Sequence, residues 1–362
     1  MNSQGRTVQH LSLHRSAGVE LRVVADIEEG VLPIIEAEDT VLRGYAGTAG
    51  SPLTSVTLFI LADLQPLARQ LRAQVATLPD GLEPGDLDSR PILNVYDLAN
   101  PTACHVFVNR QALLAAGYWG DRVAVRGLLA HEHAHPLSEN ATTRASRQIT
   151  LQVTPQLADT VCGPLQSDAR SDLELRMQRV LAALARKLCL DAPRELFANQ
   201  QVIAGGFGDD LFHLDQRTVQ AACQAVTGRE GLRQQLQAEM ARGALTALGV
   251  ELLLLVGDLQ GYLDLALETA SFYRSDGQRQ AHELESALET CVFPHLDPQA
   301  PLAYRALRDP YLALPANLAP SELIAWGDSV LVILAQAVAE KGMALRHHLA
   351  MAEEHDGGTT HA

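Results

Sequence analysis

LLAHEHAH, residues 128–135, is the stretch of this sequence that limits the fold most strongly. It holds His131 and His135, with Glu132 directly after the first histidine. Residues four apart on an α-helix differ by about 40° in direction, so the two imidazoles leave one face and can reach one ion. Glu132 lies about 100° round the helix, beside the ion, where a carboxylate can take a proton from an attacking water. The stretch predicts a metal-binding helix, which we expect to begin near Asp121, a residue type that caps helix N-termini.

The sequence before this helix is typical of strands. Two runs rich in β-branched and apolar residues, Ile92–Leu98 and Cys104–Asn109, predict a hairpin or a pair of neighbouring strands. Residues 19–61 contain further runs of this kind, separated by glycine and proline, and predict more strands. A helix is expected over 64–78, followed by a turn-rich loop over 79–91.

The sequence after the motif has an almost entirely helical pattern. Six proline residues between Pro294 and Pro320 break this pattern and predict a connection without regular structure. A last helix is expected from Ser321 to about Met351, with His347 and His348 near its end, and residues 353–362 are expected to be a disordered tail. The other helices are predicted at Asp168–Leu190, Pro193–Ala204, Leu214–Val226, Gly231–Val256, Tyr262–Arg274 and Gly277–Thr290.

Composition and charge narrow the classes of partner. Aromatic residues make up 4% and apolar residues 47% of the chain, which favours a helix-rich globular protein. The net charge of -15 disfavours nucleic acid as a partner, because that affinity comes mainly from Lys and Arg. Five cysteines without a C-x-x-C pattern predict neither a disulfide framework nor a thiolate zinc site. No export signal or membrane span is recognisable, so we expect a cytoplasmic protein.

Two segments together resemble a known family. NVYDLANPTACHVFVNRQALL (94–114) followed by VAVRGLLAHEHAH (123–135) is similar to the core of gluzincin zinc metallopeptidases, particularly the CAAX-processing endopeptidase type and the minigluzincins, over about residues 94–201. The resemblance implies an α+β, helix-rich fold, with a zincin-like core of a small mixed sheet and an active-site helix before a mainly helical C-terminal region. The expected domains are 1–90 (N-terminal α/β region), 91–212 (zincin-like catalytic core), 213–352 (helical region) and 353–362 (tail).

The third metal ligand lies outside the motif and has several candidates. In the resembled family it is a glutamate within a pattern like E-x-x-A-D, and this chain offers Glu195 with Asn199 in place of the aspartate. The amide of Asn199 could accept a hydrogen bond from a ligand imidazole but brings no charge. Glu139, four residues after His135, is a rival ligand, although Pro136 should kink or end the helix before it. Asp209, Asp210 and His213 are further candidate ligands.

The predicted function is zinc-dependent hydrolysis, most simply of peptide bonds, with Glu132 as general base and His213 as a candidate oxyanion donor. In the resembled peptidases an extended substrate pairs with a strand beside the metal, and residues 104–109 occupy the matching place in the sequence. One alternative is a non-catalytic helical interaction protein with a structural or vestigial zinc site, whose C-terminal helices bind a protein partner. Another is a zinc hydrolase acting on a non-peptide amide or ester.

Overall fold

The computed structural model describes residues 8–46, 53–67, 69, 90–162 and 167–352. The fold is α+β and rich in helix, as expected. The chain divides into two compact units. The N-terminal unit consists of Met1–Glu139 and Phe197–Arg217, and the C-terminal unit of Asn140–Leu196 and Thr218–Ala362. One boundary between them falls within the helix that carries Glu195 and Asn199.

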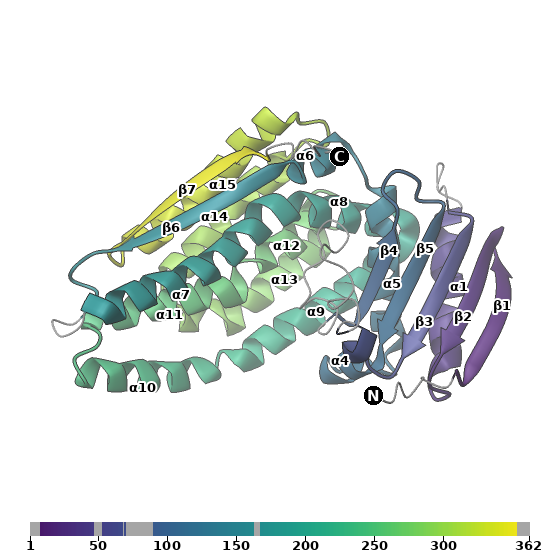
Figure 1. Cartoon of the computed structure of the whole chain (residues 1–362), viewed down its shortest axis with the longest axis horizontal. Helices are drawn as coiled ribbons and strands as arrows, with labels where there is room; N and C mark the ends of the chain where they lie inside the picture. The colour runs from purple at the N-terminus through teal and green to yellow at the C-terminus, as the bar shows by residue number, and fades with distance from the viewer. Residues whose placement is uncertain (1–7, 47–52, 68, 70–89, 163–166, 353–362) are drawn as a thin grey trace, which may run out of the picture. The chain divides into compact units, whose positions relative to one another are not determined.

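A mixed sheet of five strands organises the N-terminal unit, in the order β1-β2-β3-β5-β4 (Figure 1). β1 pairs antiparallel with β2, which pairs in parallel with β3, and β3 in parallel with β5. β4 pairs antiparallel with β5, as the sequence predicted for these two neighbours. The strands are β1 (His10–Ser16), β2 (Val19–Ala25), β3 (Ser55–Leu61), β4 (Ile92–Tyr96) and β5 (Ala103–Asn109).

Two helices cover one face of this sheet. α1 (Val31–Ala46) packs against α5 (Arg122–Leu137), and α5 in turn contacts β4. The alternation of β2 explains the arrangement, since Leu21 and Val23 are fully buried on one face while Glu20 and Arg22 are exposed on the other. Neither β1 nor α1 was expected from the sequence, which suggested only strands over 19–61. The short α4 (Arg110–Ala115) follows β5.

The C-terminal unit is mainly helical, with one two-stranded sheet. In that sheet β6 (Ile149–Leu157) pairs antiparallel with β7 (Met343–Met351), which lies along α15 (Pro320–Ala339) (Figure 1). The other helices that belong wholly or partly to this unit are α6 (Ala141–Ser146), α7 (Ser167–Arg186), α8 (Ala192–Val202), α9 (Gly208–Ala225), α10 (Gly228–Ala241), α11 (Ala247–Tyr262), α12 (Leu265–Tyr273), α13 (Gln278–Cys291) and α14 (Gln299–Ala313).

Three expectations for the C-terminal half are wrong. The helix predicted from Ser321 to Met351 ends at Ala339, and His347 and His348 lie on strand β7, because that segment alternates between buried and exposed residues and finds β6 as a partner. The proline-rich connection contains the helix α14, which accommodates Pro301 in its first turn. The single helix expected over 231–256 is divided at Arg242 and Gly243, where Gly243 adopts a positive φ.

Some expectations fall outside what the structure describes or decides. The tail at 353–362 and most of the helix expected over 64–78 lie outside the described residues. The proposed domain limits at 90, 212 and 352 remain predictions. α15 is the one described helix long and apolar enough to cross a membrane by length and composition, and seven of its residues are buried within the protein. All five cysteines are free thiols.

Candidate metal centre

The motif lies on α5 as the sequence predicted. Asp121 caps the helix by accepting a hydrogen bond from the Ala124 N–H at 3.0 Å. The helix ends at Leu137, one residue after Pro136, so the predicted stop is confirmed. His131 is half-buried and His135 is buried, and their ring centroids lie 4.7 Å apart at an interplanar angle of 82°. Two imidazoles in this edge-to-face arrangement can direct nitrogen lone pairs at one point.

Glu195 completes a group of three potential ligands. One ligand atom from each of His131, His135 and Glu195 lies within 4.8 Å of the other two. The distances are suited to a divalent cation, whose bonds to imidazole nitrogen and carboxylate oxygen are about 2.0–2.2 Å long for zinc. Among the described residues no fourth His, Cys, Asp or Glu joins the group. Glu139, the rival third ligand, lies beyond the end of α5 and is not a member.

The helix α8 holds both Glu195 and Asn199, one turn apart on the same side. Oδ1 of Asn199 can only accept, so the 2.8 Å bond to Nδ1 of His131 requires that nitrogen to carry the proton. The nitrogen of His131 without a proton is then Nε2, which has the lone pair that a cation requires. The sequence predicted this role for Asn199. The same bond links the part of α8 that carries Asn199 to the motif helix.

A turn of π-helix precedes α8, and a kink follows it. The π-turn spans Lys187–Asp191, and the kink lies in Ile203–Phe207, where Gly206 has a non-helical φ of 88° between α8 and α9. The kink packs against α1 through Phe207 and Tyr45, which form an aromatic pair with centroids 5.4 Å apart. A π-turn such as the first is frequent at functional sites, since it shifts the direction of side chains without ending the helix. The π-turn and the kink are invisible to a periodicity of 3.6 residues, and the sequence predicted neither.

Glu132 is buried and fixed by β4. Its Oε2 accepts a hydrogen bond from the backbone N–H of Asn94, and its backbone oxygen accepts one from the Asn94 side chain, both at 3.1 Å. A carboxylate held next to two potential ligand imidazoles can accept a proton from water. The sequence placed Glu132 on the motif helix, where it lies, but gave no indication of Asn94 as its partner.

His133 faces away from the ligand group, as predicted. Its Nε2 lies 2.7 Å from Oε1 of Glu38 on α1, and both side chains are buried. Burial by itself would lower the pKa of His133, but the Glu38 carboxylate and, to a smaller extent, Cys104 raise that pKa well above its usual value. The contact links α5 to α1 on the side of α5 opposite to His131 and His135. It is a structural contact rather than a ligand bond.

His213 lies at the other end of α5, away from the group. Its Nε2 is 2.8 Å from Oδ2 of Asp121, the residue that caps the helix, and Arg217 donates to the same oxygen at 2.7 Å. Asp121 and His131 are ten residues apart on a helix that rises about 1.5 Å per residue, so roughly 15 Å separates the two positions. The structure therefore does not bring His213 to the potential ligands.

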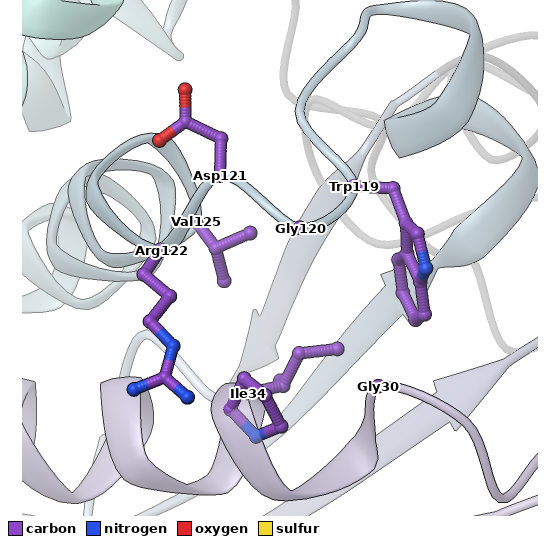
Figure 2. Close-up of a pocket in the computed structure, with 8 residues that line it drawn as sticks. Gly30, Ile34, Trp119, Gly120, Asp121, Arg122 and Val125 are labelled. Atoms are coloured by element: carbon purple, nitrogen blue, oxygen red, sulfur yellow. The ribbon is translucent and has the colours of Figure 1, made fainter.

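A small cavity adjoins this end of α5. It has a volume of about 50 Å³ and is lined mainly by Ile34, Trp119, Val125 and the backbone of Gly30. Figure 2 shows the Asp121 carboxylate pointing away from Ile34 and Trp119. A space of this size holds a few water molecules.

Asp209 and Asp210, which the sequence offered as further candidate ligands, also lie outside the group of three. Asp209 is exposed on α9. Asp210 binds the guanidinium of Arg126 through two hydrogen bonds of 2.9 and 2.5 Å. Both carboxylate oxygens of Asp210 are therefore engaged in an ion pair with Arg126. Glu195 is the one acidic residue in the described part of the chain that joins the two histidines.

Asp215 on α9 is a buried carboxyl that the sequence did not single out. Its Oδ2 has no hydrogen-bond partner in the described part of the chain. Burial raises the pKa of Asp215 to about 8, and the charge of His131 opposes this rise. The helix α9 passes α5 closely at Gly127, where an added Cβ would lie 2.8 Å from Leu214. An aspartate in an amphipathic helix normally faces solvent, so no sequence signal distinguished this one.

Strand β5, which was expected to pair with an extended substrate, is already paired on both of its edges. β5 is hydrogen-bonded to β3 on one side and to β4 on the other, which leaves no free edge at 104–109. β4 is the last strand in the order of the described sheet and is the strand that contacts α5. Comparison with known proteins finds no family model, curated protein or solved structure that matches this chain.

Proposed function

We propose that this protein is a zinc-dependent hydrolase, most simply a metallopeptidase with a zincin-like core of the gluzincin type. The observation that carries the proposal is the convergence of His131, His135 and Glu195 within 4.8 Å of one another. Two imidazole nitrogens and one carboxylate oxygen form a donor set used by catalytic zinc sites, which keep a fourth position open. The absence of a fourth ligand among the described residues agrees with such an open position.

The residues of the chain would divide the work as follows. A zinc ion at this group supplies Lewis acidity for the scissile carbonyl and for the attacking water. Glu132 accepts the proton of that water and returns it to the leaving amine. Asn94 holds Oε2 of Glu132 in place for this transfer. Asn199 keeps the proton of His131 on Nδ1 and so fixes the nitrogen that faces the cation.

An extended peptide is the substrate that best suits the sheet. β4 ends the described strand order, and its position against α5 would bring a strand paired with it close to Glu132. Backbone pairing of this kind recognises peptide with little regard to side chains. The proposal therefore transfers the expected docking strand from 104–109 to Ile92–Tyr96.

The test combines metal analysis with one substitution. Purified protein should contain close to one zinc per chain and cleave members of a peptide library. Glu132→Gln should keep the zinc and lose cleavage, whereas His213→Gln should keep both, because His213 lies away from the group. Full activity in Glu132→Gln would remove this residue from the mechanism. Zinc without turnover of peptides, amides or esters would favour a structural site in a helical interaction protein.

A further inference from the structure

Asn94 makes two hydrogen bonds to Glu132, one to its side chain and one to its backbone. The backbone N–H of Asn94 donates to the carboxylate, and its side-chain Nδ2–H donates to the backbone oxygen, each at 3.1 Å. Both residues are buried, with exposed fractions of 5% for Asn94 and 7% for Glu132. A hydrogen bond from a side chain to a carbonyl within a helix is unusual, because such a carbonyl is normally bonded to the N–H four residues later.

Pro136 explains why this carbonyl is open. It stands four residues after Glu132 inside α5 and has no N–H, so the helix cannot make this bond itself. An unbonded buried carbonyl costs free energy comparable to a lost hydrogen bond. The amide of Asn94 takes the place of the missing donor from the neighbouring strand. Pro136 thus weakens the last turn of the motif helix and at the same time creates an acceptor for β4.

The register of the sheet explains why the backbone N–H of Asn94 is available. The Asn109 N–H donates to the Pro91 oxygen at 2.9 Å, which makes these two residues a hydrogen-bonded pair. Pair types alternate along an antiparallel ladder, so Asn94 and Val106, three pairs further on, form a non-hydrogen-bonded pair. The N–H of Asn94 is therefore directed away from β5 and reaches the Glu132 carboxylate.

We propose that Asn94 is the positioning residue for Glu132, and that Pro136 makes this possible by leaving the Glu132 carbonyl without a helix partner. The side chain of Asn94 fixes the backbone of Glu132, and its backbone fixes the carboxylate. Only the catalytic consequence rests on the proposed hydrolase function, since the replacement of one hydrogen bond by another can be tested in its absence. A shift of about 1 Å in a reacting group can lower a rate by about 100-fold.

A double-mutant cycle on the metal-free chain tests the hydrogen-bond replacement. Asn94→Ala alone should raise the unfolding equilibrium constant about tenfold, because the buried carbonyl of Glu132 loses the donor that stands in for the missing N–H of Pro136. In the background of Pro136→Ala, which restores a helix N–H at this carbonyl, the same change should raise it no more than about threefold. An equal increase in both backgrounds would overturn the proposal. Asn94→Leu, which has a similar volume and loses the donor without adding a charge, serves where Asn94→Ala does not fold.

The zinc-loaded chain tests the positioning role. Asn94→Ala should lower kcat by about 10- to 100-fold with zinc content and KM retained, and Pro136→Ala should restore most of it. Asn109→Ala is the matched control, since this buried asparagine caps α4 by accepting a hydrogen bond from the Ala112 N–H, a bond that Pro136→Ala does not replace. An unchanged kcat in Asn94→Ala, or equal recovery of the Asn109 variant, would contradict positioning. If the wild type hydrolyses none of the substrates, the proposed hydrolase function is wrong. The unfolding cycle then still tests whether the Asn94 side chain replaces the missing helix hydrogen bond.

Discussion

The Nδ1–H of His131 donates a hydrogen bond of 2.8 Å to the side-chain oxygen of Asn199. The partner of a ligand imidazole is often a carboxylate, which raises the basicity of the ring. Here an amide fixes the same tautomer without adding charge. Asn199 therefore orients His131 but adds no negative charge that would stabilise a bound cation. Substitutions of Asn199 can measure the effects of orientation and of charge separately.

Replacement of Asn199 by Asp should tighten zinc binding by about tenfold. The carboxylate keeps the hydrogen bond to Nδ1 of His131 and adds a negative charge that makes the imidazole a stronger ligand. Asn199→Ala should weaken binding by about 10- to 100-fold, since the imidazole loses its orienting partner. Competition with a chromophoric chelator measures both affinities. Equal affinities in the wild type and both variants would mean that His131 does not bind the metal.

Glu195 and Glu139 can be separated by matched substitutions. Glu195→Gln should reduce zinc affinity by at least about 100-fold, because an anionic ligand becomes a neutral one in the group of three. Glu139→Gln removes the same charge from a residue beyond the end of α5 and should leave the affinity within about twofold. The opposite ranking of the two variants would restore Glu139 as the third ligand.

The part of the site that could be predicted depends on local signals. The period of the motif, the cap at Asp121 and the stop at Pro136 all lie within one helix, and each was read correctly. The two bonds of Asn94 to Glu132 join a strand to a helix 38 residues later, and nothing in either segment specifies that they meet. Glu195, the candidate third ligand, was suggested by a resemblance rather than by spacing, and it lies within the group of three.

The fold shows the same limit. The segment 343–351 alternates between buried and exposed residues, which is the signature of a strand, but its partner β6 lies about 200 residues earlier in the chain. Because the helical pattern of the preceding α15 was the stronger local signal, the predicted helix was continued into this segment. α14 was missed for the opposite reason, since its prolines are read as breaks although one of them sits in the first turn, where it costs no hydrogen bond.

Asp215 should make the stability of the metal-free protein depend on pH. Its pKa is raised from 3.8 to about 8 by burial, so the unfolded chain loses this proton near pH 4 while the folded protein keeps it to about pH 8. The free energy of unfolding should therefore fall as pH rises across this interval, by on the order of a few kcal/mol, and level off above it. Asp215→Asn should remove this slope in urea unfolding with chelator present. Asp209→Asn, an exposed neighbour on α9, should retain it.

The buried pair of His133 and Glu38 should be more costly to break than to replace. Glu38→Leu leaves a buried imidazole without its partner at 2.7 Å and should lower the free energy of unfolding by about 3 kcal/mol. The double variant Glu38→Leu/His133→Leu removes both polar groups and should regain most of that loss, because apolar side chains of similar volume fill the space between α5 and α1. Denaturant unfolding of the wild type, Glu38→Leu and the double variant measures the loss and its recovery.

Zinc affinity in the same double variant decides what His133 does. His133 lies between His131 and His135 in the sequence, yet its Nε2 is committed to Glu38 and it stands outside the ligand group. The double variant should therefore bind zinc within about threefold of the wild type, since α5 keeps its packing and both ligand histidines. Loss of zinc binding from a double variant that is folded and stable would show that the His133–Glu38 pair orients the face of α5 that carries His131 and His135. Zinc binding would then depend on this pair as well as on the bond between His131 and Asn199.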